Sequence, residues 1–371
     1  MHTNTEILHT KIDITRAHPN VTPLFQASSF LSSSEYFYTR KSNPNSAELE
    51  EVLKKLEGCE YVASVTTGMA AISMAMRLLQ PGDHLLVNEL IYGCSYQYFE
   101  EFSHHYQIHL DFVDMTDLAG LTAKLRPSTK MIFFETPTNP LLKTISIKQV
   151  AELRDSHCPS ALIVVDNTWA TSLFQKPLKC GADLSVVSGT KFYGGHSDCM
   201  AGFISTNQKE LAEKIFSFRF FQGCILDPHS AWLMRRSMQT FTLRMREHES
   251  KLKVLSGFLR ELPEVNQVYL PEIDDSQMTG YGCILFFELK DQYKDQVSQF
   301  MDSLQLFDRG TSMACVVSAV AQPFSGSHLS MSAEAKIRVG IKETLIRLCF
   351  GLEEAEDLKE DLLQAFGKLH A

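Results

Sequence analysis

Lys191 follows an apolar run and stands among hydroxyl-bearing and glycine residues. The run Leu184–Val187 is typical of a buried strand, and Ser188 and Thr190 flank the lysine. Asp166 ends an earlier aliphatic run in the same way. A lysine amine can condense with an aldehyde, an acid can pair with a protonated ring nitrogen, and hydroxyls can bind a phosphate. These are the groups that pyridoxal 5′-phosphate (PLP) requires, so the pattern predicts a PLP site.

A second phosphate-binding element is expected at Gly68 and Met69. They open a predicted helix after Thr67, where free backbone amides and the helix dipole favour an anion. Taken alone, a glycine at this place more often marks the ordinary start of a helix than an anion-binding site. The hydroxyls and lysine elsewhere in the chain favour the phosphate. Tyr92 could stack on the cofactor ring or pack in the core, and its spacing favours neither.

Two charged residues in apolar surroundings have alternative interpretations. A carboxylate at Asp166 is costly unless it meets a cation or several donors, and a protonated pyridine nitrogen would be such a partner. A loop or helix-capping aspartate is the alternative. Arg347 lies in the strand-like segment Leu345–Phe350 and has the bidentate fork that suits a substrate carboxylate. A structural ion pair is the alternative for Arg347.

The middle of the chain must supply the elements that position these groups. Strand and helix patterns alternate there, which predicts an α/β fold with a mostly parallel, doubly wound sheet. Ligands of such sheets bind beyond the carboxyl ends of the strands, where Glu135, Asn139, Asp166, Thr168, Ser188 and Lys191 fall. The expected strands are His84–Val87, Ile108–Val113, Met131–Phe134, Leu162–Val165 and Leu184–Val187.

Helices are expected around that sheet and beyond it. One should begin at Asn45-Ser46 and close at Gly58, and another should run from Gly68 to Pro81-Gly82. After about residue 230 a long helical pattern, Trp232–Leu262, leads into an α+β region. The chain is therefore divided into residues 1–45, poor in regular structure, a large α/β domain at 46–230 and a C-terminal α+β domain at 231–371.

Composition excludes several classes of function. The net charge of −9 offers no surface that would neutralise nucleic-acid phosphates. No apolar run is long enough to span a bilayer, and the N-terminus lacks the pattern of a signal peptide. Nine scattered cysteines suit free thiols in the cytoplasm. His196, Asp198 and Cys199 are poorly spaced for one tetrahedral centre, so no metal is expected.

These residues belong to ordered motifs, and the chain resembles the Cys/Met-metabolism family of PLP enzymes from about Pro23 to its end. The family includes cystathionine γ-synthase, cystathionine β- and γ-lyases, methionine γ-lyase and O-acylhomoserine sulfhydrylases. The matching segments are Tyr36–Arg40 with Asn43-Pro44, Gly68-Met69, Tyr92-Gly93, Glu135–Pro140, Val165–Thr168, Ser188–Asp198, Ser312 and Leu345–Leu348 with Gly351–Glu353.

The resemblance implies fold type I, the aspartate-aminotransferase type, with a seven-stranded sheet, and a homotetramer of two tight dimers. Lys191 would be the Schiff-base lysine and proton carrier, and Asp166 would hold the ring nitrogen. Asn139 would contact the ring hydroxyl, and Tyr92 would stack on the ring and assist the chemistry. Gly68, Met69, Ser188 and Thr190 would bind the phosphate. Tyr38 and Arg40, in the N-terminal arm, would reach the phosphate of the neighbouring subunit, and Ser312 and Arg347 would hold the substrate carboxylate.

The chain departs from the family pattern around the expected substrate pocket. Gln97 replaces an arginine of cystathionine-handling relatives, and Thr311 replaces their selective residue before Ser312. Met313-Ala314-Cys315 replaces Leu-Gly-Gly, and Arg219-Phe220 replaces the Lys-Asp pair of methionine γ-lyases. Thr311 and Gln97 are therefore expected to shape an unusual substrate pocket, less suited to a second charged amino-acid group.

The reaction implied is γ-elimination or γ-replacement on a homoserine-derived or sulfur-containing amino acid. A β C–S lyase is the first alternative, and a PLP-binding protein without turnover is the second. The intact Lys191, Asp166, Tyr92 and Arg347 argue against the inactive alternative. The small-molecule substrate itself stays open.

Overall fold

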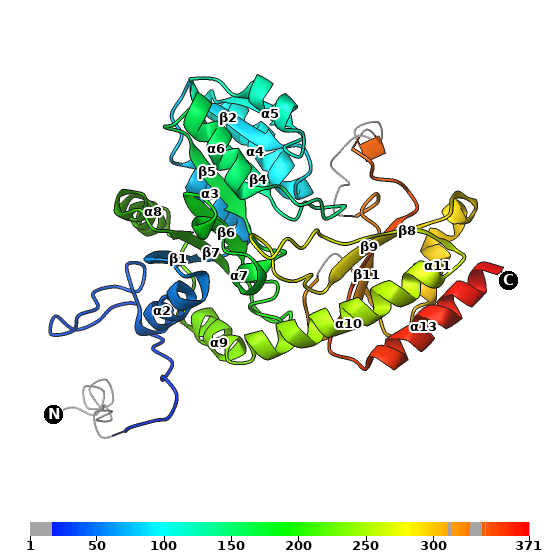
Figure 1. Ribbon diagram of the computed structural model, residues 1–371. Helices are drawn as coiled ribbons and strands as arrows, with labels where there is room; N and C mark the ends of the chain where they lie inside the picture. Colours follow the sequence, from blue (N-terminus) through cyan, green and yellow to red (C-terminus); the bar gives the residue numbers. More distant parts are fainter. Residues whose placement is uncertain (1–16, 311–312, 327–335, 338, 371) are drawn as a thin grey trace.

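The computed structural model describes residues 17–310, 313–326, 336–337 and 339–370. Thr311 and Ser312 lie outside the described residues. Two β-sheets organise the chain, one built from residues 61–206 and the other from residues 265–349. The long helix α10, Phe241–Glu261, runs from the region of the first sheet along the second (Figure 1). No helix in the described part of the chain is long and apolar enough to cross a membrane.

The larger sheet has seven strands in the order β1-β7-β6-β5-β4-β2-β3. Five consecutive strands of the sheet are parallel to one another, namely β6, β5, β4, β2 and β3. Strand β7 is antiparallel to both of its neighbours, β1 and β6. All five predicted strands are present, within a few residues of their expected ends. The bounds are Tyr61–Val65 (β1), His84–Asn88 (β2), His109–Val113 (β3), Thr129–Glu135 (β4), Leu162–Asp166 (β5), Leu184–Ser188 (β6) and Gly202–Thr206 (β7).

Helices cover both faces of this sheet, because its apolar strands must be shielded on each side. Residues of α3, α4 and α8 pack on one face, and residues of α5 and α6 pack on the other. The mostly parallel, doubly wound sheet expected from the sequence is confirmed. The helix bounds are Pro44–Glu57 (α2), Gly68–Met76 (α3), Gly93–Tyr106 (α4), Leu118–Lys124 (α5), Ile147–His157 (α6), Thr171–Phe174 (α7) and Lys209–Gln222 (α8).

The predicted end of α3 at Pro81-Gly82 is wrong. The helix stops at Met76 because the following amides, those of Leu78 and Leu79, bond carbonyls only three residues back. Such bonds tighten the chain into turns rather than continuing an α-helix. By contrast, α2 ends as expected at Gly58, whose φ of 70° lies in the left-handed region.

The smaller sheet has the order β10-β11-β12-β9-β8 and carries helices on its outer side (Figure 1). Its apolar residues pack with those of α10, α11 and α13 in a separate core. The expected α+β region is therefore present. The bounds are Val265–Tyr269 (β8), Ile284–Leu289 (β9), Asp308–Arg309 (β10), Ala319–Ala321 (β11), Leu345–Cys349 (β12), Val297–Ser303 (α11) and Ala355–Gly367 (α13).

The single long helix predicted for Trp232–Leu262 is two helices. One of them, α9, spans Pro228–Met238, and α10 follows after a break at Gln239-Thr240. The Ser237 carbonyl accepts from the Thr240 amide at 3.2 Å and from Arg244 Nη2 at 3.2 Å. Because these two donors occupy the Ser237 carbonyl, it does not accept the backbone hydrogen bond that would continue the helix.

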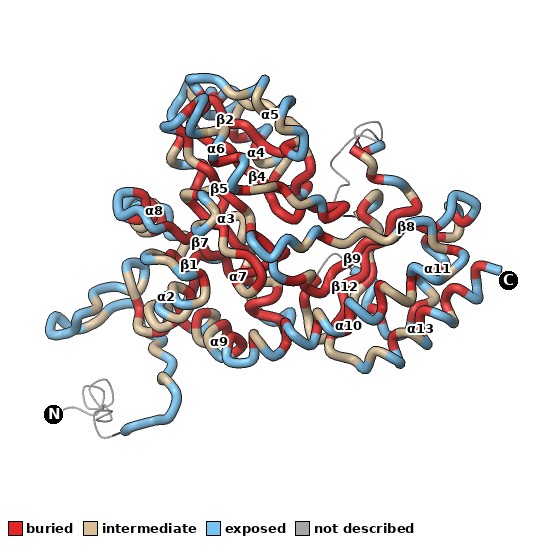
Figure 2. Tube along the Cα trace, viewed as in Figure 1, coloured by how far each residue is buried: buried red, intermediate tan, exposed pale blue. Residues whose placement is uncertain are grey.

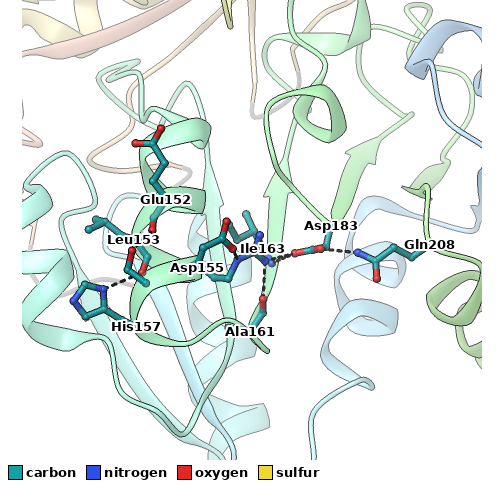
Figure 3. A network of polar contacts seen from close by, with 10 residues as sticks. Glu152, Leu153, Asp155, His157, Ala161, Ile163, Asp183 and Gln208 are labelled. Carbon is teal, nitrogen blue, oxygen red and sulfur yellow. Dashed lines mark hydrogen bonds and ion pairs between the residues drawn. The ribbon is translucent and has the colours of Figure 1, made fainter.

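A polar network ties the strands together at the edge remote from their carboxyl ends (Figure 3). Asp183, just before β6, accepts from Arg154 Nη1 at 2.8 Å, from the Ile163 amide at 2.8 Å and from Gln208 Nε2 at 2.6 Å. Arg154 also donates to the Ala161 carbonyl at 2.8 Å. One carboxylate therefore links α6, β5 and the segment that leads into α8.

The described part of the N-terminal segment extends away from the large sheet (Figure 1) and is mostly exposed (Figure 2). Trp232 Nε1 donates to the Thr22 carbonyl at 3.0 Å, which anchors the segment on α9. Within residues 17–43 no helix or extended strand forms. Buried residues instead follow the two sheets and the inner faces of their helices (Figure 2).

Candidate active site

A cavity of about 390 Å³ lies at the carboxyl ends of β4, β5 and β6. The polar residues that follow these strands meet there, as the parallel topology requires. The lining residues are Thr67, Gly68, Met69, Ile72, Tyr92, Cys94, Ser95, Glu135, Asn139, Asp166, Thr168, Trp169, Ser188, Thr190, Lys191, Met200, Met313, Gly326 and Arg347.

Lys191 enters this cavity from the turn after β6. Its amide donates to the Ser188 carbonyl at 3.2 Å, and Thr190 Oγ1 accepts from the Ala201 amide at 3.1 Å. Burial, and then the nearby charge of Arg347, lower the pKa of the Lys191 amine. A lysine with a lowered pKa is a better nucleophile and base near neutral pH.

Asp166 ends β5 and faces the same cavity as Lys191. Its Oδ1 accepts from the Thr168 amide at 2.9 Å, and Thr168 Oγ1 accepts from the Ser188 amide at 2.8 Å. Thr168 therefore joins the ends of β5 and β6 and holds both residues in register. Burial raises the pKa of Asp166 to about 6, against the opposing effect of the Thr168 hydrogen bonds.

The N-terminus of α3 forms a narrow cradle beside these strands. A Cβ at Gly68 would lie 2.8 Å from Ser188 Cβ, and a Cβ at Gly202 would lie 2.0 Å from the Thr67 carbonyl oxygen. Glycine at both positions lets the helix end approach β6 and β7. Thr67 caps the helix by accepting from the Ala70 amide at 3.1 Å. The Ser188 and Thr190 hydroxyls line the cavity beside this helix end, so hydroxyls and helix amides can bind one anion together.

Tyr92 is at the N-terminus of α4, with 39% of its surface exposed. Its amide donates to Glu135 Oε1 at 2.8 Å, which fixes the backbone from which the ring projects. Burial raises the pKa of the Tyr92 phenol to about 12, with a further contribution from Cys94. The phenol therefore keeps its proton near neutral pH and can act as an acid.

Arg347 enters the cavity from the other sheet. It lies in the middle of β12, paired with Phe286 of β9 and Ala321 of β11, and is 3% exposed. Its Nη1 lies 4.0 Å from Met313 Sδ. Burial lowers the pKa of the Arg347 guanidinium, which keeps its charge because an arginine titrates so far above neutrality.

Not every expected site residue reaches this cavity. Gln97 is exposed on α4 and does not line it. Gln97 comes two positions after the lining residue Ser95, which places it about 200° further around the helix. Tyr38 and Arg40 also lie away from their own chain's cavity. Arg40 instead rests 4.5 Å from the centre of the Phe220 ring on α8.

Several residues that line the cavity have no role among the sequence-based expectations. Glu135 is 1% exposed and ends β4 directly beside Asp166. The apolar part of the lining comes from residues that motif spacing does not single out, among them Trp169, Met200 and Met313. The place of Glu135 at the end of a predicted strand was already visible in the sequence, but no role followed from that place alone.

Comparison with known proteins places this geometry in a family. The family model described as Cys/Met metabolism PLP-dependent enzyme matches residues 4–367. The chain belongs to this family. Family members are PLP-dependent enzymes of sulfur amino-acid metabolism, and the fold is that of PLP enzymes of fold type I. The resemblance inferred from the sequence motifs is thereby confirmed.

Relatives with several activities are similar to this family member. Cystathionine beta-lyase of Lactococcus lactis subsp. cremoris is 35% identical, over 98% of each chain. The cystathionine gamma-synthase/O-acetylhomoserine (thiol)-lyase of Bacillus subtilis is 35% identical, over 90% of this chain and 86% of its own length. The crystal structure of cystathionine gamma-lyase from Lactobacillus plantarum, complexed with L-serine, covers 100% of both chains with a TM-score of 0.90 and 32% identity.

The residues present fit the PLP of the family. The cavity holds a narrow cradle at Gly68 that suits an anion, an amine with a lowered pKa at Lys191 and a carboxyl group at Asp166. These match the phosphate, the aldehyde and the ring nitrogen of the cofactor in chemical type. The described residues offer no cluster of acidic, histidine and cysteine side chains able to hold a metal ion.

Proposed function

We propose that the protein catalyses γ-elimination or γ-replacement on a homoserine-derived or sulfur-containing amino acid. One observation carries the proposal: a lysine, a protonated tyrosine and a buried arginine converge on one cavity beside the PLP-type anion cradle. Relatives named cystathionine gamma-synthase and cystathionine gamma-lyase support it.

The cofactor would be held by residues from three strand ends and one helix. Gly68, Met69, Ser188 and Thr190 would bind its phosphate. Asp166 would hold the ring nitrogen, Asn139 the ring hydroxyl, and Thr168 would position Asp166. When bound, PLP supplies an electron sink that makes a proton on the substrate Cα acidic.

The remaining roles fall to side chains that face the substrate. Arg347 would bind the substrate carboxylate through its two parallel N–H groups, with Ser312 as the second contact. Lys191 would take the Cα proton, since its pKa is lowered by burial and by Arg347. Tyr92, whose pKa is raised to about 12, would donate a proton to the departing group. Thr311 would border the distal part of the pocket.

A substrate panel tests this function directly. Purified enzyme with PLP is incubated with cystathionine, methionine, homocysteine, cysteine, and O-acetyl-, O-succinyl- and O-phosphohomoserine with a thiol. We expect 2-oxobutyrate or a thiol-substituted product from a four-carbon substrate. Mass spectrometry of the products distinguishes elimination from replacement. If no member of the panel gives a keto acid or a substituted product, γ chemistry is ruled out for this protein.

A β C–S lyase is the second candidate, because relatives named cystathionine beta-lyase align over 98% of the chain. The same panel separates the two candidates. Pyruvate from cystathionine identifies cleavage at the β carbon, whereas 2-oxobutyrate identifies cleavage at the γ carbon.

The arrangement of the domains and subunits is part of the proposal. Residues 1–45 would be an arm that contributes Tyr38 and Arg40 to a neighbouring subunit's site. Residues 46–230 would form the PLP-binding domain and residues 231–371 the C-terminal domain, in a homotetramer. The arm supports this, since Phe37 is 71% exposed and Arg40 lies outside its own cavity. We place the enzyme in the cytoplasm, as all nine cysteines are free.

A further inference from the structure

Two carboxyl groups stand side by side at the carboxyl ends of β4 and β5. The register of these parallel strands pairs Glu135 with Asp166, and both residues line the active-site cavity. Neighbouring strands lie about 4.8 Å apart, so the two groups share one small volume. The proposed function uses Asp166 and gives no task to Glu135.

The two oxygens of Glu135 have different surroundings. Oε1 accepts from the Tyr92 amide at 2.8 Å. Oε2 is buried and has no hydrogen-bond partner among the described residues. A buried carboxylate oxygen without a donor is costly, whereas a protonated oxygen there can itself donate.

Electrostatic repulsion and hydrogen bonding favour a proton on Glu135 rather than on Asp166. Two adjacent carboxylates cannot both ionise cheaply in a buried site, so one of them holds a proton. Asp166 accepts the Thr168 amide at 2.9 Å, which favours its charged form. Burial and then Asp166 raise the pKa of Glu135 well above its usual range, against the Tyr92 amide. The other titratable groups that face the cavity are Tyr92, Cys94, Lys191 and Arg347.

We propose that Glu135 is a positioning residue that remains a neutral carboxylic acid. Its Oε1 holds the Tyr92 backbone, and its Oε2 carries a proton directed at Asp166. This inference rests on the proposed function, because it assigns Glu135 to the support of Asp166 and Tyr92. Asp166 would then keep the negative charge that a protonated ring nitrogen needs, and the Tyr92 backbone would stay fixed at the cavity.

Cofactor-free protein tests the protonation state without any reference to catalysis. Glu135→Gln keeps the shape, the acceptor and a donor, but does not titrate. Because the pKa of Glu135 is raised in the folded protein, its contribution to the free energy of unfolding is fully present below the ordinary glutamate pKa of 4.5. That contribution is lost as the pH rises toward the folded-state pKa. The variant avoids that loss. The unfolding equilibrium constant of the parent, divided by that of the variant, should rise about tenfold per pH unit above pH 4.5, until the folded-state pKa is reached.

A matched control and a contrary outcome make this test decisive. Glu152 on α6 is exposed, and Glu152→Gln should give a ratio that is flat with pH. A flat ratio for Glu135→Gln would mean that Glu135 is ionised in the folded protein, and the proposal would be withdrawn. If the protein binds no PLP but the ratio still rises, the proposed function fails while the protonation of Glu135 stands.

Rescue separates positioning from simple packing in the PLP-loaded enzyme. Glu135→Ala removes the acceptor of the Tyr92 amide and the donor to Asp166, and Glu135→Gln restores both. We expect Glu135→Gln to turn over at least about tenfold faster than Glu135→Ala. The pH midpoint of the bound-PLP absorbance should be the same in Glu135→Gln and the parent. Equal impairment of both variants, or a shifted midpoint in Glu135→Gln, would show that the site needs a charged Glu135.

Discussion

At the scale of single residues, the surroundings of Lys191 set the pKa of its amine. Burial and the positive charge of Arg347 both disfavour the ammonium form, so the pKa of the Lys191 amine is lowered. Tyr92, in the same cavity, shows the opposite effect, with its pKa raised to about 12. One cavity thus holds an amine that is more readily deprotonated and a phenol that keeps its proton near neutral pH.

Lys191→Ala should abolish the visible absorbance of covalently bound PLP, because no other amine is expected to reach the aldehyde. Absorption spectra of the purified protein, before and after borohydride treatment, measure the covalent link. Lys209, exposed at the start of α8, provides the control, and Lys209→Ala should leave the spectrum unchanged. An intact covalent band in Lys191→Ala would refute the assignment of the lysine.

At the scale of secondary-structure elements, the site depends on strands held in register from their remote ends. The Asp183 network joins α6, β5 and the segment before α8 at the opposite edge of the sheet from the cavity (Figure 3). The side chains of Arg154 and Asp183 are each 13% exposed, so their ion pair is largely shielded from water. Removing one partner of such a pair leaves the other without compensation.

Asp183→Ala should lower the free energy of unfolding by about 2–4 kcal/mol, since it removes the shielded carboxylate that pairs with Arg154 and leaves the Ile163 amide without its side-chain acceptor. Urea unfolding followed by circular dichroism measures the change. The exposed pair of Lys148 and Glu152 on the same helix is the control, with its charges 4.0 Å apart. Glu152→Ala should change stability by less than about 0.5 kcal/mol. Equal losses in both variants would show that burial does not strengthen the Asp183 pair.

At the scale of the whole molecule, the two sheets meet around one cavity, and the N-terminal segment points away from it. Arg347 reaches the cavity from the smaller sheet, whereas Lys191 and Asp166 reach it from the larger one. Tyr38 and Arg40 belong to the described N-terminal residues 17–43 and do not line the cavity of their own chain. A site completed by a neighbouring subunit would give this exposed segment a function.

Arg40→Ala should weaken PLP retention if the arm completes the neighbouring site, because a phosphate contact is lost. Equilibrium dialysis of the PLP-loaded protein, together with light scattering, separates loss of cofactor from loss of assembly. Arg77 is a matched control, since it lies 5.6 Å from the centre of the Phe218 ring on α8, and Arg40 lies 4.5 Å from the Phe220 ring on the same helix. Arg77→Ala should retain PLP as the parent does. A tetrameric Arg40→Ala variant with unchanged PLP affinity would disprove the shared site.

Local patterns in the sequence determined the parallel sheet and the cofactor side of the site. Most of the expected strands were short apolar runs, and the residues after Val165 and Val187 already included an acid and a lysine. These features are local, because a strand ends where its apolar run ends. The family motifs are also local stretches of sequence, and they indicated the fold type.

Only the tertiary structure decided which residues share the cavity. Glu135 and Asp166 are adjacent through strand pairing, although β4 and β5 are separated by α6 in the chain. The break between α9 and α10 follows from Arg244 binding the Ser237 carbonyl, a contact made by side-chain packing. Gln97 is excluded by the rotation of α4. Each of these outcomes depends on distances between segments, which residue types and spacing along the chain do not contain.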